Sequence, residues 1–71
     1  MLIKEIDEYG GLKILKNEVS ERYFLEVDGT RYHINSKDPE EVTKRGGVAQ
    51  QIEQKGIDKK GLTNKLKEVV Q

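Results

Sequence analysis

One face of the C-terminal segment carries side-chain types that other proteins use to bind nucleic acids. Residues 55–67 hold five lysines and a single acid, Asp58. Lysine, threonine and asparagine contact phosphates and base edges when a helix enters a DNA groove. With Leu62 as origin and about 100° per residue, the helical positions between about 100° and 200° are Lys60, Thr63, Asn64 and Lys67. The sequence predicts a basic helical face that contacts DNA or RNA; a solvated amphipathic helix is the alternative.

A second candidate surface lies on a predicted β-hairpin over residues 22–35. Asp28-Gly29 is typical of a two-residue type I′ turn, because both central residues need positive φ. This turn pairs Phe24 with His33, on a face that also holds Arg22 and Arg31. Aromatic rings among bases can stack single-stranded nucleic acid while arginines take the phosphates. The alternative is structural: the N-terminal segment covers Phe24, and Glu26 and Arg31 form an ordinary ion pair.

The chemistry of an enzyme finds little support in the sequence. Cysteine is absent, and the single histidine, His33, falls within a predicted strand with no serine placed beside it. The glycine pairs at 10–11 and 46–47 lack the strand-to-helix context and the Lys-Ser/Thr ending of a phosphate-binding loop. We expect no catalytic residues, no cofactor and no metal site.

The N-terminal part is predicted to add further elements around the hairpin. Leu2, Ile3, Ile6 and Tyr9 have spacings of one, three and three, which favour a helix over residues 2–9 ended by Gly10-Gly11. A short strand is the competing interpretation of that segment. Residues 12–16 are predicted to form a strand.

The C-terminal half carries start and stop signals for helices. Asp38 is a predicted cap, Pro39 suits the first helical position, and Gly46-Gly47 should weaken or break the helix that follows. Gly56 suits the position just after a helix, and Asp58 is a predicted cap for the last helix. The apolar face of that helix is Leu62, Leu66, Val69 and Val70.

The last two predicted helices resemble a helix-turn-helix unit. Residues 48–55 and 58–70 flank a Gly56-Ile57 turn, and Leu62 follows at an expected apolar position. The resemblance implies that the second helix enters a DNA groove. The sequence departs from the pattern at Gln51, Ile52, Lys55 and Lys65.

Length and composition bound the remaining possibilities. The 71 residues suffice for a single domain, over 1–71, with a thin core, so a partner protein or a second copy would add stability. The formal net charge is zero, which argues against a general polyanion binder. No apolar run approaches the roughly 20 residues of a membrane span, and we expect a cytoplasmic protein.

The sequence thus predicts an α+β fold: a β-hairpin or three-stranded antiparallel meander with two or three C-terminal helices packed on one face. The predicted function is a non-enzymatic, nucleic-acid-associated module. The alternative is a protein-interaction or regulatory module, acting as a homodimer or bound to another protein.

Overall fold

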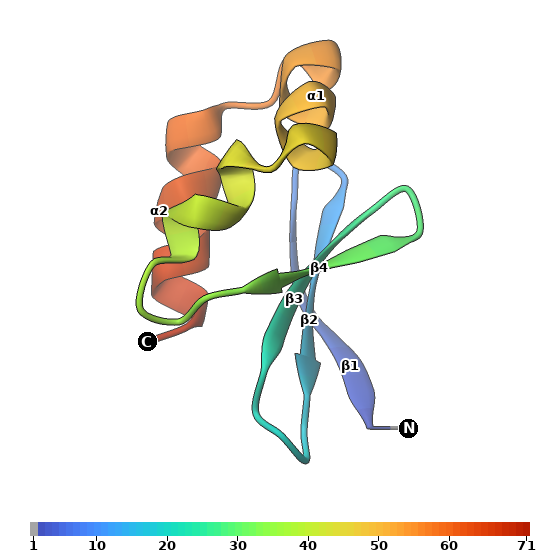
Figure 1. The fold of residues 1–71 in the computed structure, drawn as a ribbon, viewed down its shortest axis with the longest axis vertical. Coiled ribbons are helices and arrows are strands. Elements are labelled where there is room, and N and C mark those ends of the chain that lie inside the picture. The colour runs from blue at the N-terminus through green and yellow to red at the C-terminus, as the bar shows by residue number, and fades with distance from the viewer. Residues whose placement is uncertain (1) are drawn as a thin grey trace.

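An antiparallel sheet followed by helices forms the structure, a computed structural model that describes residues 2–71 (Figure 1). Four strands lie in the order β1-β2-β3-β4, so every strand pairs with its sequence neighbour. The predicted α+β fold class is confirmed, with one strand more than expected. The elements are β1 (Ile3–Tyr9), β2 (Leu12–Asn17), β3 (Tyr23–Val27), β4 (Thr30–Ile34), the 3₁₀ helix η1 (Pro39–Lys44), α1 (Gly46–Lys55) and α2 (Lys59–Val69).

The predicted hairpin is confirmed by the pairing of β3 with β4. Asp28 and Gly29 have φ values of 49° and 80°, as a type I′ turn requires. The register pairs Val27 with Thr30 and Phe24 with His33. Turn chemistry and apolar alternation therefore identified the same register from the sequence.

The helix predicted over residues 2–9 is wrong, and the competing strand is correct. Gly10 and Gly11, at φ 58° and 84°, turn β1 back along β2. The helix-like spacing of Ile3, Ile6 and Tyr9 has a physical reason. The register of β1 shifts between Glu5 and Asp7, and such a bulge breaks the strict two-residue alternation of a strand.

The core lies between one face of the sheet and the helices. The strands contribute alternate residues, and the helices contribute the stripe predicted at Leu62 and Leu66. Val69 and Val70 are only partly buried against this core. The buried apolar residues of the core are Leu12, Ile14, Leu25, Val27, Ile34, Val42, Val48, Ile52, Leu62 and Leu66.

Most of the predicted helix boundaries are confirmed. Gly56 ends α1 in the left-handed region at φ 63°, and the Asp58 carboxylate accepts from the Lys60 amide at 3.2 Å. The break predicted at Gly46-Gly47 falls one residue earlier, because Arg45, extended at φ −68° and ψ 140°, separates η1 from α1, and the two glycines begin α1. Asp38 occupies the predicted cap position before Pro39, but its side chain makes no capping hydrogen bond, and the helix that follows is a 3₁₀ helix. Within residues 2–71 no helix is both long and apolar enough to cross a membrane.

Two tyrosines of the sheet pack against glycines of the helices. A Cβ at Gly47 of α1 would overlap the hydroxyl of Tyr32, and a Cβ at Gly61 of α2 would overlap the hydroxyl of Tyr9. Glycine inside a helix costs about 1 kcal/mol against alanine. At these two positions, however, the missing side chain leaves room for a tyrosine, which an alanine would displace. The two contacts therefore set the distance of both helices from the sheet.

Candidate functional site

A hollow between η1 and α2 brings the predicted helical site residues together. We call it the lysine groove. It has a volume of about 440 Å³ and is open to solvent. Its lining consists of Glu40, Lys59, Lys60, Thr63, Asn64 and Lys67. All four residues predicted from the helical face, Lys60, Thr63, Asn64 and Lys67, therefore line one surface.

Thr63 departs from its predicted orientation. The sequence placed it on the outward face, but its side chain is only 8% exposed, while Lys60, Asn64 and Lys67 are exposed. The reason is that η1 packs against α2, which a helical projection of α2 alone does not include. Thr63 thus belongs to the wall of the lysine groove, and the exposed polar contacts come from its neighbours.

The charge of the lysine groove comes from three ammonium groups. Within residues 2–71, Lys59, Lys60 and Lys67 take part in no ion pair. Lys65 differs from them, because its Nζ lies 3.0 Å from the Asp7 carboxylate of β1. The first turn of α2 contains no acid, and the positive end of the helix dipole also favours an anion there.

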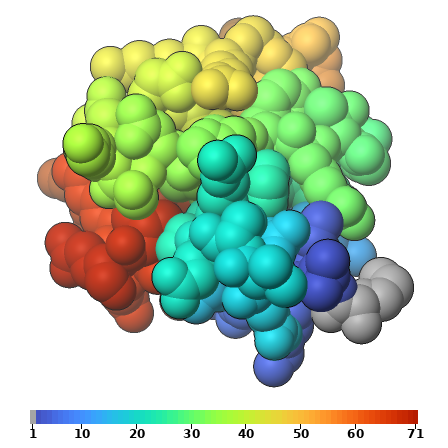
Figure 2. Space-filling view, turned by 60° about the horizontal axis from the view of Figure 1, so that its bottom comes forward, coloured from blue at the N-terminus to red at the C-terminus, as the bar shows by residue number. Residues whose placement is uncertain are grey.

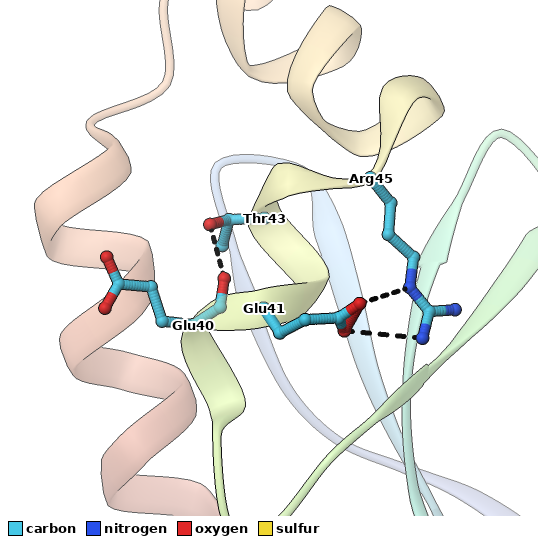
Figure 3. Close-up of polar contacts among 4 residues, drawn as sticks. All are labelled: Glu40, Glu41, Thr43 and Arg45. Carbon is cyan, nitrogen blue, oxygen red and sulfur yellow. Dashed lines mark hydrogen bonds and ion pairs between the residues drawn. The ribbon is translucent and has the colours of Figure 1, made fainter.

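Glu40 is the acidic member of the lysine groove, and η1 fixes its position. Thr43 Oγ1 donates to the Glu40 carbonyl at 2.7 Å within the 3₁₀ turn. The next residue, Glu41, binds Arg45 through two contacts of 3.2 and 3.3 Å. Figure 3 shows the two carboxylates pointing apart, with Glu40 toward α2 and Glu41 toward Arg45. Only Glu40 therefore opposes an anion in the groove.

The predicted stacking surface lies on the sheet face that is turned away from the helices. Phe24 and His33 contact one another edge to face, with centroids 5.7 Å apart and planes at 69°. Arg31 Nε lies 3.3 Å from Glu26 Oε1, so its charge is already paired. Arg22 is exposed and lies just outside β3. The structure brings Phe24, His33 and Arg31 together. The two rings already contact each other, however, and the Arg31 guanidinium is already paired with Glu26.

Phe24 also has a packing role that the sequence left open. Its β2 neighbour on this outer face is Leu15, which is 6% exposed although no helix of residues 2–71 covers that side. Phe24 is itself half-buried. The outer face therefore holds a small apolar cluster, and the N-terminal strand β1 borders it through the pairing of Glu5 with Leu15.

Two residues of the lysine groove were missed from the sequence. Lys59 falls at about 60° from Leu62 on a helical projection, outside the predicted face between about 100° and 200°. Glu40 belongs to η1, and only the packing of η1 on α2 brings it to the groove. A wider arc would have found the lysine, whereas nothing in the local sequence indicates the acid.

Comparison of the chain with family models, with curated proteins and with solved structures finds no match. Among residues 2–71, no group of three or more histidine, cysteine, aspartate or glutamate side chains is placed to hold a metal ion. Function is therefore inferred from the geometry and charge of the lysine groove.

Proposed function

We propose that this chain is a non-enzymatic cytoplasmic module that binds the phosphate backbone of DNA or RNA in the lysine groove. The observation that carries the proposal is the convergence of three lysines without ion pairs, Lys59, Lys60 and Lys67, on one open hollow beside a single acid. Lysine is a point-charge phosphate ligand, and phosphate contacts supply most nonspecific nucleic-acid affinity.

The spacing along α2 supports contact with several phosphates. Lys60 and Lys67 lie seven residues apart, which is about 10 Å along a helix axis. Duplex DNA rises about 3.4 Å per nucleotide on each strand, so this distance corresponds to about three nucleotide steps. Asn64, between the two lysines, supplies an amide that can donate to phosphate or sugar oxygens.

The wall formed by η1 favours backbone contact over base reading. A recognition helix must stand clear of its neighbours to enter the major groove. Here η1 packs along α2, and Thr63 is buried between them. We therefore propose binding that depends on charge and salt more than on base sequence.

The test is fluorescence anisotropy with labelled random duplex DNA, single-stranded DNA and single-stranded RNA at several salt concentrations. Three phosphate contacts predict a log–log salt slope of about −2.7 for duplex and about −2.1 for a single strand. Lys60→Ala and Lys67→Ala should each weaken binding by about threefold or more at low salt and reduce the slope by about one.

The matched control is Lys13→Ala, which removes the same charge from β2 on the opposite side of the sheet. This variant should retain the affinity of the unmodified chain. Equal losses for Lys13→Ala and Lys60→Ala would assign the effect to net charge, and unchanged affinity for Lys60→Ala and Lys67→Ala together would refute the proposal.

Self-association is the second candidate function, and one observation favours it. The large apolar side chains most exposed to solvent are Leu2, Ile6 and Val19, at 58%, 39% and 72%. The Glu18 amide donates to the Leu2 carbonyl at 2.8 Å, so Leu2 and Val19 lie at one end of the molecule. Sedimentation equilibrium at micromolar concentration tests this candidate, since a monomer at all concentrations would exclude a dimer in that range.

A further inference from the structure

A second basic hollow lies on β1 and β2, away from the lysine groove. Its volume is about 360 Å³, and its lining is Lys4, Ile6, Lys16 and Glu18. Figure 2 views the end of the molecule where the first residues of β1 (dark blue) lie beside the turn between β2 and β3 (cyan). None of the residues that line this second hollow belongs to η1 or α2, so the hollow is separate from the lysine groove.

Two like charges on neighbouring strands line this hollow. Lys4 and Lys16 are direct cross-strand partners, an arrangement that destabilises a sheet when both side chains carry the same charge. Within residues 2–71 neither lysine forms an ion pair. The Nζ of Lys16 instead lies 5.5 Å from the ring centroid of Tyr23. A carboxylate placed between Lys4 and Lys16 would remove the repulsion.

An apolar side chain lies beside these charges. Ile6 follows Lys4 by two positions, a spacing that strand alternation places on one face of a sheet, and both side chains line this hollow. Ile6 is 39% exposed, so a ligand can cover it. The hollow therefore combines two cations with an apolar side chain.

We propose that this hollow binds an acidic, apolar-flanked segment of a partner protein. One glutamate or aspartate of the segment lies between Lys4 and Lys16, and an adjacent aliphatic side chain covers Ile6. The two lysines and one glutamate of the hollow give it a net charge of +1, which matches one peptide carboxylate better than a phosphate dianion. The free outer edge of β1, with which no strand of residues 2–71 pairs, offers main-chain groups to an extended segment.

The inference is independent of nucleic-acid binding in the lysine groove. Its first test is an NMR titration of the ¹⁵N-labelled full chain with a blocked hexapeptide that alternates valine and glutamate. The amide signals of Lys4, Ile6 and Lys16 should shift, while those of α2 should not. The same peptide with glutamine in place of glutamate should bind at least fivefold more weakly. Equal binding of the two peptides would overturn the role of the lysines.

Variants give the second test. Lys4→Gln and Lys16→Gln should each weaken peptide binding by about twofold to fivefold, the range for solvent-exposed ion pairs. Lys13→Gln, which changes a lysine on the other face of β2, should leave binding unchanged. Inorganic phosphate alone, at the same ionic strength, should not displace the peptide; displacement at millimolar concentration would overturn the choice of a peptide ligand.

Thermal unfolding of the same variants should show a gain in stability where the titration shows a loss of peptide affinity. Because Lys4→Gln removes a like-charge contact, the free variant should unfold at a higher temperature than the unmodified chain even though it binds the peptide less well. If Lys4→Gln stabilises the fold and weakens peptide binding, the two lysines serve a ligand at the expense of stability. A lower unfolding temperature for Lys4→Gln would overturn the premise that the two lysines repel each other.

Discussion

Asp7 of β1 and Lys65 of α2 form an ion pair with an Oδ2–Nζ distance of 3.0 Å. Of the ion pairs found in residues 2–71, it is the one that joins the sheet to a helix. The pair removes Lys65 from the set of free lysines on α2.

The pH dependence of stability should report this pair. The pKa of Asp7 is lowered from its ordinary value of 3.8, first by the hydrogen bond from the Glu8 amide and then by Lys65. The pKa of Lys65 is raised from 10.5 by its hydrogen bond to Asp7. The Asp7 contribution is therefore present above pH 3.8 and lost as pH falls through the lowered pKa. The Lys65 contribution is present below pH 10.5 and lost as pH rises through the raised pKa.

A double-mutant cycle with Asp7→Asn and Lys65→Met measures this coupling. Urea unfolding should give a constant coupling between about pH 5 and pH 9, which declines in stronger acid and in stronger alkali. The asparagine can still accept from the Glu8 amide, so the cycle isolates the ion pair. A coupling that persists unchanged at pH 2 would show that the two side chains interact through something other than their charges.

Removing the acid from the lysine groove should strengthen nucleic-acid binding. Glu40→Gln deletes the negative charge that faces Lys59 and Lys60 without changing the shape of the groove. We expect the affinity for nucleic acid to rise about twofold to fivefold at low salt. Glu41→Gln is the matched control, because that carboxylate points toward Arg45. Equal gains from both variants would attribute the effect to net charge alone.

Phe24→Ala should affect stability and spare nucleic-acid binding. Phe24 is half-buried beside Leu15 on the outer face of the sheet, so truncation should lower the free energy of unfolding by about 1–2 kcal/mol. Urea unfolding and RNA anisotropy on the same sample measure both effects. A folded variant that loses single-strand binding would instead restore the hairpin as a stacking surface.

Gly47→Ala should destabilise the protein by about 1–3 kcal/mol, although alanine is the better helix former. The new Cβ would overlap the Tyr32 hydroxyl. Tyr32→Phe in the same chain should recover most of the loss, because the next atom, Cζ, lies 3.2 Å from the ideal Cβ position. Thermal unfolding of the two single variants and the double variant measures the rescue.

The Gly61→Ala substitution provides the contrast. There the Cζ atom of Tyr9 lies 2.9 Å from the ideal Cβ position, so Tyr9→Phe should not restore stability. Rescue at both sites, or at neither, would contradict the packing described for the two tyrosines.

Local signals were sufficient where one short segment determines its own conformation. Asp28-Gly29 specified the β3–β4 turn and hence the pairing of Phe24 with His33. Gly56 and Asp58 specified the end of α1 and the start of α2. These features depend on φ values and on hydrogen bonds between neighbouring residues, and both are determined by residue types that lie close together in the sequence.

Features that depend on packing between distant segments were predicted incompletely. The three-residue spacing of Ile3, Ile6 and Tyr9 predicts a helix, but β1 accommodates it as a strand because its bulge interrupts the two-residue alternation. The helical projection of α2 predicts an outward Thr63, because η1, which packs against α2, belongs to a distant part of the sequence. The hollow at Lys4 and Lys16 could not be found without the pairing of β1 with β2, since the two lysines are twelve positions apart.

The strand order has a consequence for how fast the chain folds. Because β1, β2, β3 and β4 pair in sequence order, each hairpin closes a short loop and no strand waits for a distant partner. Proteins with such local pairing fold faster than those that must assemble parallel or crossed strands. We therefore expect single-exponential refolding within milliseconds, without a populated intermediate, in a stopped-flow experiment. During synthesis, all three hairpins can form before α2 has left the ribosome, so the sheet can serve as the template on which the helices are placed.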